Sequence, residues 1–232
     1  MKRLLTSVFL LIIAAPLTLA APPGSRRDDA VKRLGRAGEV FTEIMAAPDA
    51  GIPEDLLDKS ECIAIVPGIT KGGFVVGARY GKGVVMCRKK DRSWTAPAFI
   101  TVSGGSVGLQ IGLQKVDLVM VIMNRHGMEQ LIGDEFTIGA DASAAAGPVG
   151  RQTSAETNIR LDAEILTYSR AKGLFAGVTL NGAVVKQDRD DNRAFYGKEM
   201  DAKTILIEGT VPIPEEAKSL AAALSWKSPN KK

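Results

Sequence analysis

The sequence predicts an α+β fold: a single domain built mainly as an antiparallel β-barrel or sandwich, with an N-terminal amphipathic helix and C-terminal helices. Three observations predict it. Apolar residues recur at helical spacing over residues 26–47, short β-rich runs divided by glycine follow Pro53, and helical patterns return in AFYGKEMDAKTILIEG and EEAKSLAAAL. The β-rich runs lie too close together for the helical crossovers of parallel strands, so the strands are expected to pair antiparallel.

The first twenty residues, MKRLLTSVFLLIIAAPLTLA, have the pattern of a secretory signal peptide. Lys2 and Arg3 precede an apolar stretch, and Pro16 interrupts that stretch, which argues against a membrane-spanning helix. We expect cleavage near Ala20. No cysteine precedes Cys62, so the chain is not expected to be a lipoprotein. Residues 21–232 are then expected to form a single domain that is periplasmic or secreted.

Residues 26–47 are expected to form one amphipathic helix that ends before Pro48. Its apolar positions, with arginine and glutamate between them, are Ala30, Val31, Leu34, Phe41, Ile44 and Met45. Two interpretations of this apolar face stay open. Most such helices dock on the core of their own domain, whereas some lie on a membrane surface.

The central region reads as a series of strands: IAIVP, FVVGARY, GVVMCRK, APAFITV, SGGSVGLQIGLQKVDLVMVIMN, EFTIGA, EILTYSR, LFAGVTL and AVVKQ. In the fifth of these, residues 107–113 alternate between apolar residues and Gly or Gln, which predicts a strand. A phosphate-binding loop would instead need Gly-Lys-Ser/Thr leading into a helix. The nucleotide-binding interpretation therefore fails. Glycines on one face of a strand leave room for a neighbouring backbone, a packed helix or a bulge that bends the sheet.

Two cysteines in a secreted chain suggest a disulfide. Cys62 and Cys87 both lie in apolar, strand-like runs, so their side chains can meet across a small meander. A bond between them would close a loop of about 25 residues, which the chain-entropy argument values at roughly 3 kcal/mol. Two buried free thiols are the alternative.

The charge of the chain gives little sign of nucleic-acid binding. Loss of Lys2 and Arg3 would take the basic residues from 30 to 28, against 26 acidic residues. Basic residues nevertheless gather in one stretch, where Asp91 is the one acid: Lys71, Arg79, Lys82, Arg88, Lys89, Lys90 and Arg92. The stretch is either a surface that faces an anion or a hairpin edge kept soluble by its charge.

Residues able to support catalysis or metal binding are few. His126 is the only histidine, and with two cysteines it provides too few zinc ligands. Asp188, Asp190, Asn192 and Glu199 have the spacing of a calcium loop, but Arg193 stands where the sharp turn needs glycine. The alternative is that one of these aspartates caps a short helix. We expect no catalytic residue, no metal and no cofactor.

Several long motifs resemble the SYLF domain, a family found in bacterial secreted proteins and in eukaryotic membrane-trafficking proteins. They are IPEDLLDKSECIAIVPGITKGGFVVGARYGKGVVMCR, WTAPAFITVSGGSVGLQIGLQ, IGADASAAAGPVGR and EILTYSRAKGLFAGVTLNGAVV followed by FYG. Together they cover residues 52–209. The resemblance implies a non-catalytic lipid-binding domain: eukaryotic members bind phosphoinositide-rich membranes, and fungal members also bind actin. Whether residues 141–150 pack tightly inside the domain or form a loop at a ligand cleft stays open.

For a secreted chain, the resemblance implies binding of anionic phospholipid or phosphoinositide-like head groups. Actin is then not an expected partner, while a structural or protein-interaction role in the cell envelope is the alternative. Head groups favour basic residues beside exposed apolar ones. Besides the basic stretch, SRAKGLFAG provides Arg170, Lys172, Leu174 and Phe175 around a glycine turn. The alternative for Leu174 and Phe175 is a hairpin whose apolar residues belong to the core.

Overall fold

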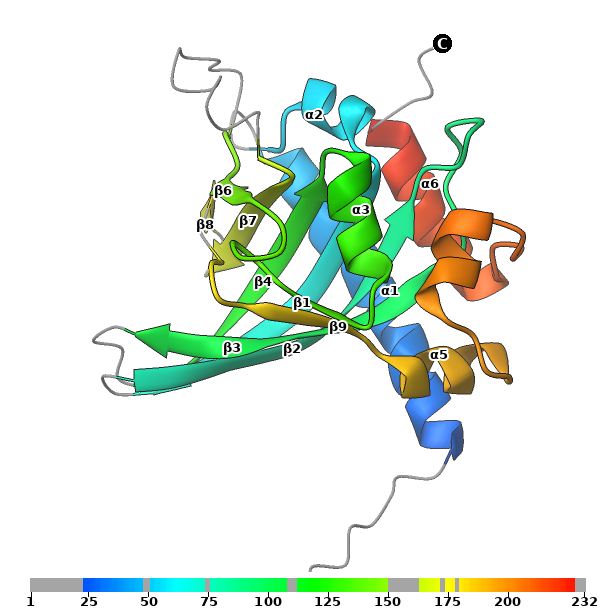
Figure 1. The fold of residues 1–232 in the computed structure, drawn as a ribbon, viewed down its shortest axis with the longest axis horizontal. Helices are drawn as coiled ribbons and strands as arrows, with labels where there is room; N and C mark the ends of the chain where they lie inside the picture. The colour runs from blue at the N-terminus through cyan, green and yellow to red at the C-terminus, as the bar shows by residue number, and fades with distance from the viewer. Residues whose placement is uncertain are drawn as a thin grey trace, which may run out of the picture.

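The computed structural model describes residues 23–47, 51–73, 76–107, 112–149, 163–171, 174–177 and 180–227 (Figure 1). Its centre is a nine-stranded sheet with the order β5-β9-β3-β2-β1-β4-β7-β6, and β8 pairs with β7 beside this path. The strands are β1 (Cys62–Gly73), β2 (Val76–Cys87), β3 (Ala98–Val107), β4 (Gly112–Ile122), β5 (Glu135–Thr137), β6 (Ala144–Ala146), β7 (Ile165–Ala171), β8 (Leu174–Gly177) and β9 (Val184–Gln187). All pairs are antiparallel except β6 with β7.

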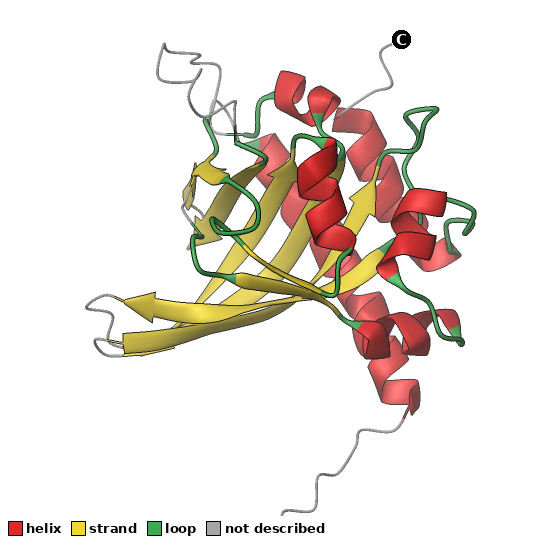
Figure 2. Ribbon diagram, in the orientation of Figure 1, coloured by secondary structure: helices red, strands yellow, loops and turns green. Residues whose placement is uncertain are grey.

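Helices cover both sides of this sheet, which curls into a half-barrel (Figure 2). They are α1 (Pro23–Ala46), α2 (Glu54–Lys59), α3 (Arg125–Ile132), α5 (Arg189–Tyr196), the π-helix η1 (Thr204–Glu208), the 3₁₀ helix η2 (Glu215–Ala217) and α6 (Lys218–Lys227). The predicted α+β class is confirmed, as are the N-terminal helix and the C-terminal helices. The sequence reading missed α2, α3 and the short strand β6.

Each face of the sheet has its own core because side chains of a strand point alternately to opposite faces. On the concave face, residues such as Val85 and Met120 pack against α3 and η1. On the convex face, residues such as Val84 and Val121 pack against α1, α2, α5 and α6. The central strands are therefore buried between two layers.

Helix α1 resolves one of the open alternatives. Five of its apolar side chains, Ala30, Leu34, Ala37, Phe41 and Ile44, are at most 1% exposed and belong to the convex core. The helix therefore docks on its own domain, and the interpretation as a membrane-surface helix is wrong.

A disulfide joins the first two strands. Cys62 and Cys87 are direct partners in the antiparallel register of β1 and β2, and their sulfur atoms are bonded. The disulfide prediction is confirmed over the free-thiol alternative, because strand pairing brings two residues 25 apart in sequence directly opposite each other.

A β-bulge at Gly68 changes which residues of β1 face the concave side. Between the pairs Ile65–Val84 and Thr70–Tyr80, β1 has one more residue than β2. Gly68 adopts φ +63°, and its backbone N–H donates to Asp117 Oδ1 at 2.8 Å. Odd-numbered residues of β1 face the convex core before the bulge and the concave side after it.

Glycines of β2 and β3 let neighbouring backbone lie close to these strands. A Cβ on Gly83 would lie 2.5 Å from the carbonyl oxygen of Ile65, and one on Gly104 would lie 3.1 Å from Cα of Ala183. Any side chain at these two positions would collide with a neighbouring backbone. The glycine for which the sequence suggested such packing, Gly108, lies outside the described residues.

The prediction of one strand over residues 107–113 is wrong. Val107 ends β3 and Gly112 begins β4, with residues 108–111 outside the described part of the chain. β3 and β4 run in opposite directions and are separated in the sheet by β2 and β1. Alternation of residue types continued through a place where the chain changes strand, so it could not locate the end of β3.

The small residues of segment 141–150 serve internal packing over the part that the structure describes, which ends at Val149. Ala144–Ala146 form β6, and the N–H of the following Gly147 donates to the carbonyl of Thr167 at 3.1 Å. A Cβ on Gly147 would overlap the ring of Tyr168, which is fully buried. Only a glycine lets the backbone lie this close to the aromatic ring.

We expect Gly147→Ala to lower the free energy of unfolding by about 1–3 kcal/mol, because the added methyl group overpacks against Tyr168. The control is Gly35→Ala in α1, where no atom lies within 4 Å of the added Cβ and which should be stabilising by roughly 0.5–1 kcal/mol. Urea denaturation measures both. Equal behaviour of the two variants would contradict the packing role of Gly147.

Candidate functional site

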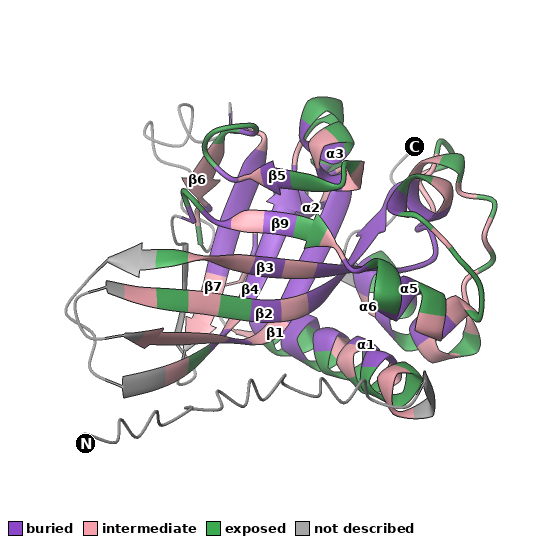
Figure 3. Cartoon of the chain, turned by 60° about the horizontal axis from the view of Figure 1, so that its bottom comes forward, coloured by how far each residue is buried: buried purple, intermediate pink, exposed green. Residues whose placement is uncertain are grey.

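One end of the half-barrel projects beyond its helices. It consists of residues 70–73 of β1, 76–81 of β2, 103–107 of β3 and 112–115 of β4, and we call it the projecting end. In Figure 3 the buried colour of the central strands gives way to half-buried and exposed residues at this end. Its sequence contains three cations, Lys71, Arg79 and Lys115, and no Asp or Glu.

Lys71 and Arg79 form a cationic pair on the concave side of the projecting end. They are direct cross-strand partners in β1 and β2, and both follow the alternation of the concave face. The Arg79 guanidinium donates from Nε and Nη2 to the carbonyl of Gly105, at 3.2 and 2.8 Å. Within the described residues, no carboxylate lies within ion-pair distance of either cation.

No acidic side chain among the described residues compensates the charges of this pair. Burial lowers the pKa of Lys71, and the charge of Arg79 lowers it further. Burial also lowers the pKa of Arg79. Both shifts mean that the folded chain disfavours these two charges, and a bound anion would relieve that cost. Cations whose pKa is lowered by burial and that have no acidic partner among the described residues are candidates for a ligand site.

The convex side of the projecting end carries an aromatic residue and a third cation. Tyr80 is 53% exposed, and Lys115 is also exposed. Thr70 is the cross-strand partner of both, so Tyr80 and Lys115 flank one position of β1 on the same face. Sequence reasoning missed both residues. Because successive side chains of a strand point to opposite faces, the stretch GARYGK could have shown that Arg79 lies on one face of β2 and that Tyr80 and Lys82 lie on the other.

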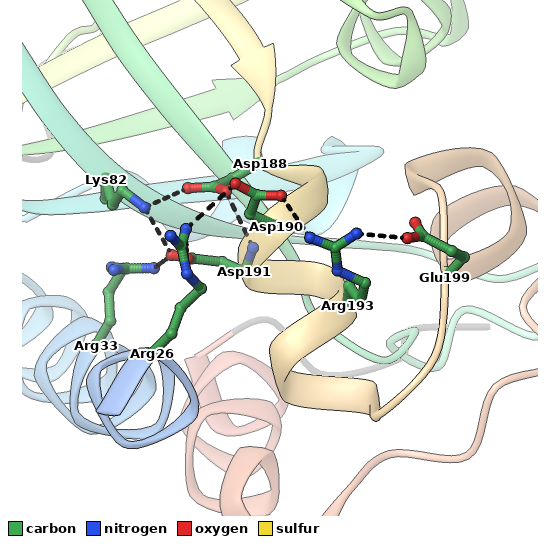
Figure 4. Close-up of polar contacts among 8 residues, drawn as sticks. All are labelled: Arg26, Arg33, Lys82, Asp188, Asp190, Asp191, Arg193 and Glu199. Carbon is green, nitrogen blue, oxygen red and sulfur yellow. Dashed lines mark hydrogen bonds and ion pairs between the residues drawn. The ribbon is translucent and has the colours of Figure 1, made fainter. Parts of the chain in front are cut away.

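Lys82, also predicted as a site residue, forms ion pairs with two aspartates away from the projecting end (Figure 4). Its Nζ lies 2.6 Å from Asp188 Oδ2 and 3.0 Å from Asp191 Oδ2, on the convex side beside α1 and α5. Burial alone would lower the pKa of Lys82, but the hydrogen bonds that Lys82 donates to the two aspartates outweigh it and raise the pKa. Lys82 is therefore a structural cation and not part of the cationic pair.

Asp191 is the centre of this cluster. Its side chain is 1% exposed and also lies 2.6 Å from Arg33 Nη1 of α1. Burial opposes its ionisation, yet the hydrogen bonds from Arg33 and Lys82 lower its pKa. The ion pairs hold α1, β2 and α5 together.

Asp188 decides between the calcium loop and the helix cap. Its side chain accepts the N–H of Asp191 at 3.0 Å and caps α5. Arg193 and Glu199, which the calcium alternative also involved, pair with each other at 2.8 Å. The helix-cap interpretation is confirmed.

Arg88, Lys89 and Lys90 lie at the opposite end of β2 from Arg79, about 30 Å away along the strand. Arg88 is 6% exposed and stacks on Trp94 at 4.0 Å from the ring centre. Lys89 and Lys90 line a depression of 700 Å³ that also holds Glu61, Asp91 and Glu208. The structure therefore places the cations of residues 71–92 in three separate locations: the projecting end, the aspartates beside α5 and the far end of β2.

The second predicted stretch is only partly described. Arg170 pairs with Asp117 at 2.7 Å and with Glu43, so its charge is compensated internally. Leu174 and Phe175 lie in β8, and Lys172 lies outside the described residues. The prediction that Lys172, Leu174 and Phe175 contact lipid stays a prediction.

His126 contacts Glu164 through Nδ1, and the other carboxylate oxygen of Glu164 accepts the N–H of Ser143 at 2.7 Å. Glu164 thus links α3 to the segment before β6. The serine and the histidine both bind the carboxylate and not each other, which is not the order of a nucleophilic triad.

The described residues thus form an α+β half-barrel whose exposed end carries uncompensated cations. Residues 103–226 match the family described as "Ysc84: Las17-binding protein actin regulator". The match covers more than half of the 232 residues, so the chain belongs to the Ysc84 family, and the resemblance to the SYLF domain is confirmed.

Curated relatives agree with this family. The chain is 34% identical over 206 residues to SH3 domain-containing YSC84-like protein 1 of Rattus norvegicus, covering 88% of the chain and 60% of the relative. The human protein of that name gives 34% over 201 residues, with 85% and 58% covered. LAS seventeen-binding protein 3 of Saccharomyces cerevisiae gives 36% over 171 residues, with 72% and 37% covered. The chain therefore spans about 60% of the length of the mammalian relatives and less of the yeast one.

The names of the family and of these relatives bear on two expectations. They describe binding proteins and name no enzymatic activity. The family description names actin regulation, so the expectation that actin is not a partner is not borne out. Among the helices that the structure describes, none is long and apolar enough to cross a membrane.

We expect Lys71→Gln to raise the free energy of unfolding at pH 7 by a few tenths of a kcal/mol, because it removes an uncompensated charge that solvent partly screens. The sign follows from the lowered pKa: between the folded value and the ordinary 10.5, the unfolded chain binds more protons, so wild-type stability rises with pH. The difference between variant and wild type should therefore shrink as pH approaches 10.5.

Urea denaturation at pH 7 and pH 10 measures this difference, with Lys115→Gln on the other face as the control. A destabilised Lys71→Gln at pH 7 would mean that the folded protein compensates this charge.

Proposed function

We propose that the protein binds anionic lipid head groups at a membrane surface, with the cationic pair Lys71 and Arg79 as the contact. The observation that carries the proposal is that these two cations share one face of the projecting end and have no acidic partner among the described residues. A phosphate group would supply the missing negative charge. Arginine presents a fork of donors to phosphate oxygens, and lysine adds a second point charge.

The position of the pair supports a membrane as the source of the phosphate. The projecting end extends beyond both helical layers, so a flat surface can reach it without meeting the helices (Figure 3). Tyr80 and Lys115 on the other face suit the boundary between head groups and acyl chains, where tyrosine is enriched. Each basic residue near an anionic surface contributes roughly 1 kcal/mol.

This role needs no chemical step, and the proposal is of a non-catalytic protein that acts in the periplasm or after secretion. The signal-like sequence of residues 1–20, which lie outside the described residues, supports that compartment. The disulfide between Cys62 and Cys87 also supports it, because disulfides persist in oxidising compartments.

The double variant Lys71→Gln with Arg79→Gln should weaken binding to vesicles containing anionic phospholipid by about 2 kcal/mol, or roughly 30-fold. The matched control is Lys89→Gln with Lys90→Gln, which removes the same charge at the opposite end of β2. It should bind within about threefold of the wild type. Vesicle co-sedimentation at low and physiological salt measures both, and added salt should weaken the wild type because exposed charges are screened.

Two results would contradict this site. If both double variants lose the same affinity, net charge and not the cationic pair drives binding. If neither variant loses affinity, SRAKGLFAG becomes the better location for lipid contact.

A role in protein interaction is the second candidate, and the family description "Las17-binding protein actin regulator" favours it. Under this alternative the chain binds a protein partner of the cell envelope or of an actin-regulating assembly. Co-sedimentation with filamentous actin, and capture of an envelope protein by the Lys71/Arg79 variant as efficiently as by wild type, would support it. Vesicle binding that depends on the cationic pair would favour the lipid proposal.

We expect the protein isolated from its native source to begin at Ala21, because cleavage near Ala20 would remove the signal-like segment. Intact mass spectrometry measures this, and the mass should be two hydrogen atoms below that of the dithiol form because of the disulfide. Ala20→Arg should block cleavage and leave the full-length mass. A native protein that retains Met1 would remove the proposed compartment.

A further inference from the structure

An apolar groove lies between the end of α5, η1 and the segment that leads into η2. It has a volume of 530 Å³, which is within the range of small-molecule sites. Its lining residues are Tyr196, Lys198, Met200, Thr204, Thr210, Val211, Pro212, Ile213 and Pro214. In Figure 1 these elements stand at the opposite side of the molecule from the projecting end. The groove and the cationic pair are therefore separate.

The lining of this groove offers few hydrogen bonds. Pro212 and Pro214 have no backbone N–H. The Tyr196 hydroxyl, buried enough that its pKa is raised, donates to the carbonyl of Pro97 at 2.6 Å, which leaves its ring as the lining surface. Met200 and Ile213 add flexible and branched apolar surface. A peptide would have to satisfy its backbone polar groups here, whereas a methylene chain has none to satisfy.

Lys198 supplies one charge to the groove. It is exposed, it belongs to the lining, and across the described ranges no carboxylate forms an ion pair with it. The neighbouring Glu199 is paired with Arg193 at 2.8 Å. An apolar groove with a single cation complements a molecule that has one apolar chain and one anionic head.

We propose that this groove binds a single-chain anionic amphiphile of the long-chain fatty acid class. The acyl chain lies along Met200, Val211 and Ile213, and the carboxylate pairs with Lys198. This ligand is a monomeric molecule held in a groove, so the proposal does not depend on membrane binding by Lys71 and Arg79.

The test measures displacement of a dansyl-labelled undecanoic acid by unlabelled competitors. Hexadecanoic acid should bind the wild type more tightly than octanoic acid does, and so displace the probe at lower concentration. The affinity should rise by up to about fourfold per added methylene while the chain stays inside the groove. Lys198→Glu should weaken the binding of hexadecanoic acid by about tenfold or more, because a charge-assisted contact is replaced by repulsion. The affinity for hexadecan-1-ol, which has no charge, should differ by less than about twofold between this variant and the wild type.

Lys203→Glu is the matched control, since Lys203 is exposed, lies near the groove and is not part of its lining. It should bind hexadecanoic acid as the wild type does. The Lys71→Gln with Arg79→Gln variant should also bind it normally, which separates this site from the vesicle site.

Three results would overturn the proposal. They are failure of hexadecanoic acid to displace the probe, an affinity independent of chain length, and equal weakening by Lys198→Glu and Lys203→Glu. Because Lys198 is exposed, its variant should fold, and circular dichroism checks that it does.

Discussion

The bulge at Gly68 is the constraint on which the arrangement of the long strands depends. One extra residue in β1, held by the hydrogen bond from the Gly68 N–H to Asp117, exchanges the two faces of the strand midway along its length. Before the bulge, Ile63 and Ile65 fill the convex core. After it, Lys71 faces the concave side together with Arg79. Without the extra residue, Lys71 would lie on the convex side, and the two cations would be on opposite faces of the sheet.

The length of the strands relative to the helical layers explains why this pair is exposed. β1 and β2 each have 12 residues, and the layers above and below them bury mainly the end that carries the disulfide. That end needs two cores because both faces of the central strands are apolar. The other end is rich in glycine and cations, so nothing in its sequence favours a second covering layer. A charged end that stays uncovered costs the folded state some stability and leaves that surface available for a ligand.

The cations discussed above fall into two groups: those that pair with an acidic side chain of the described residues and those that do not. Lys82 and Arg33 share Asp191, and Arg170 shares Asp117 and Glu43, so these cations hold elements together. Lys71, Arg79 and Lys198 have no such partner within the described residues. The two groups differ little in residue type or in local sequence. The difference arises from which carboxylates the fold brings near, since exposed charges more than about 8 Å apart are largely screened at physiological ionic strength.

The sequence by itself determined the α+β class, the amphipathic helix over residues 26–47, most of the strands and the family, because periodicity and long motifs are local properties of the chain. It also placed Cys62 and Cys87 in strands that could meet. Only the tertiary structure decided that Lys71 pairs with Arg79, that Lys82 turns to Asp188 and Asp191, and that Arg88 lies under Trp94. The physical reason is that a one-residue bulge reverses the facing of every later side chain in its strand, and no alternation pattern records it. Likewise, whether a cation has an acidic partner depends on residues that are distant in sequence: Lys82 and its partner Asp191 are 109 positions apart.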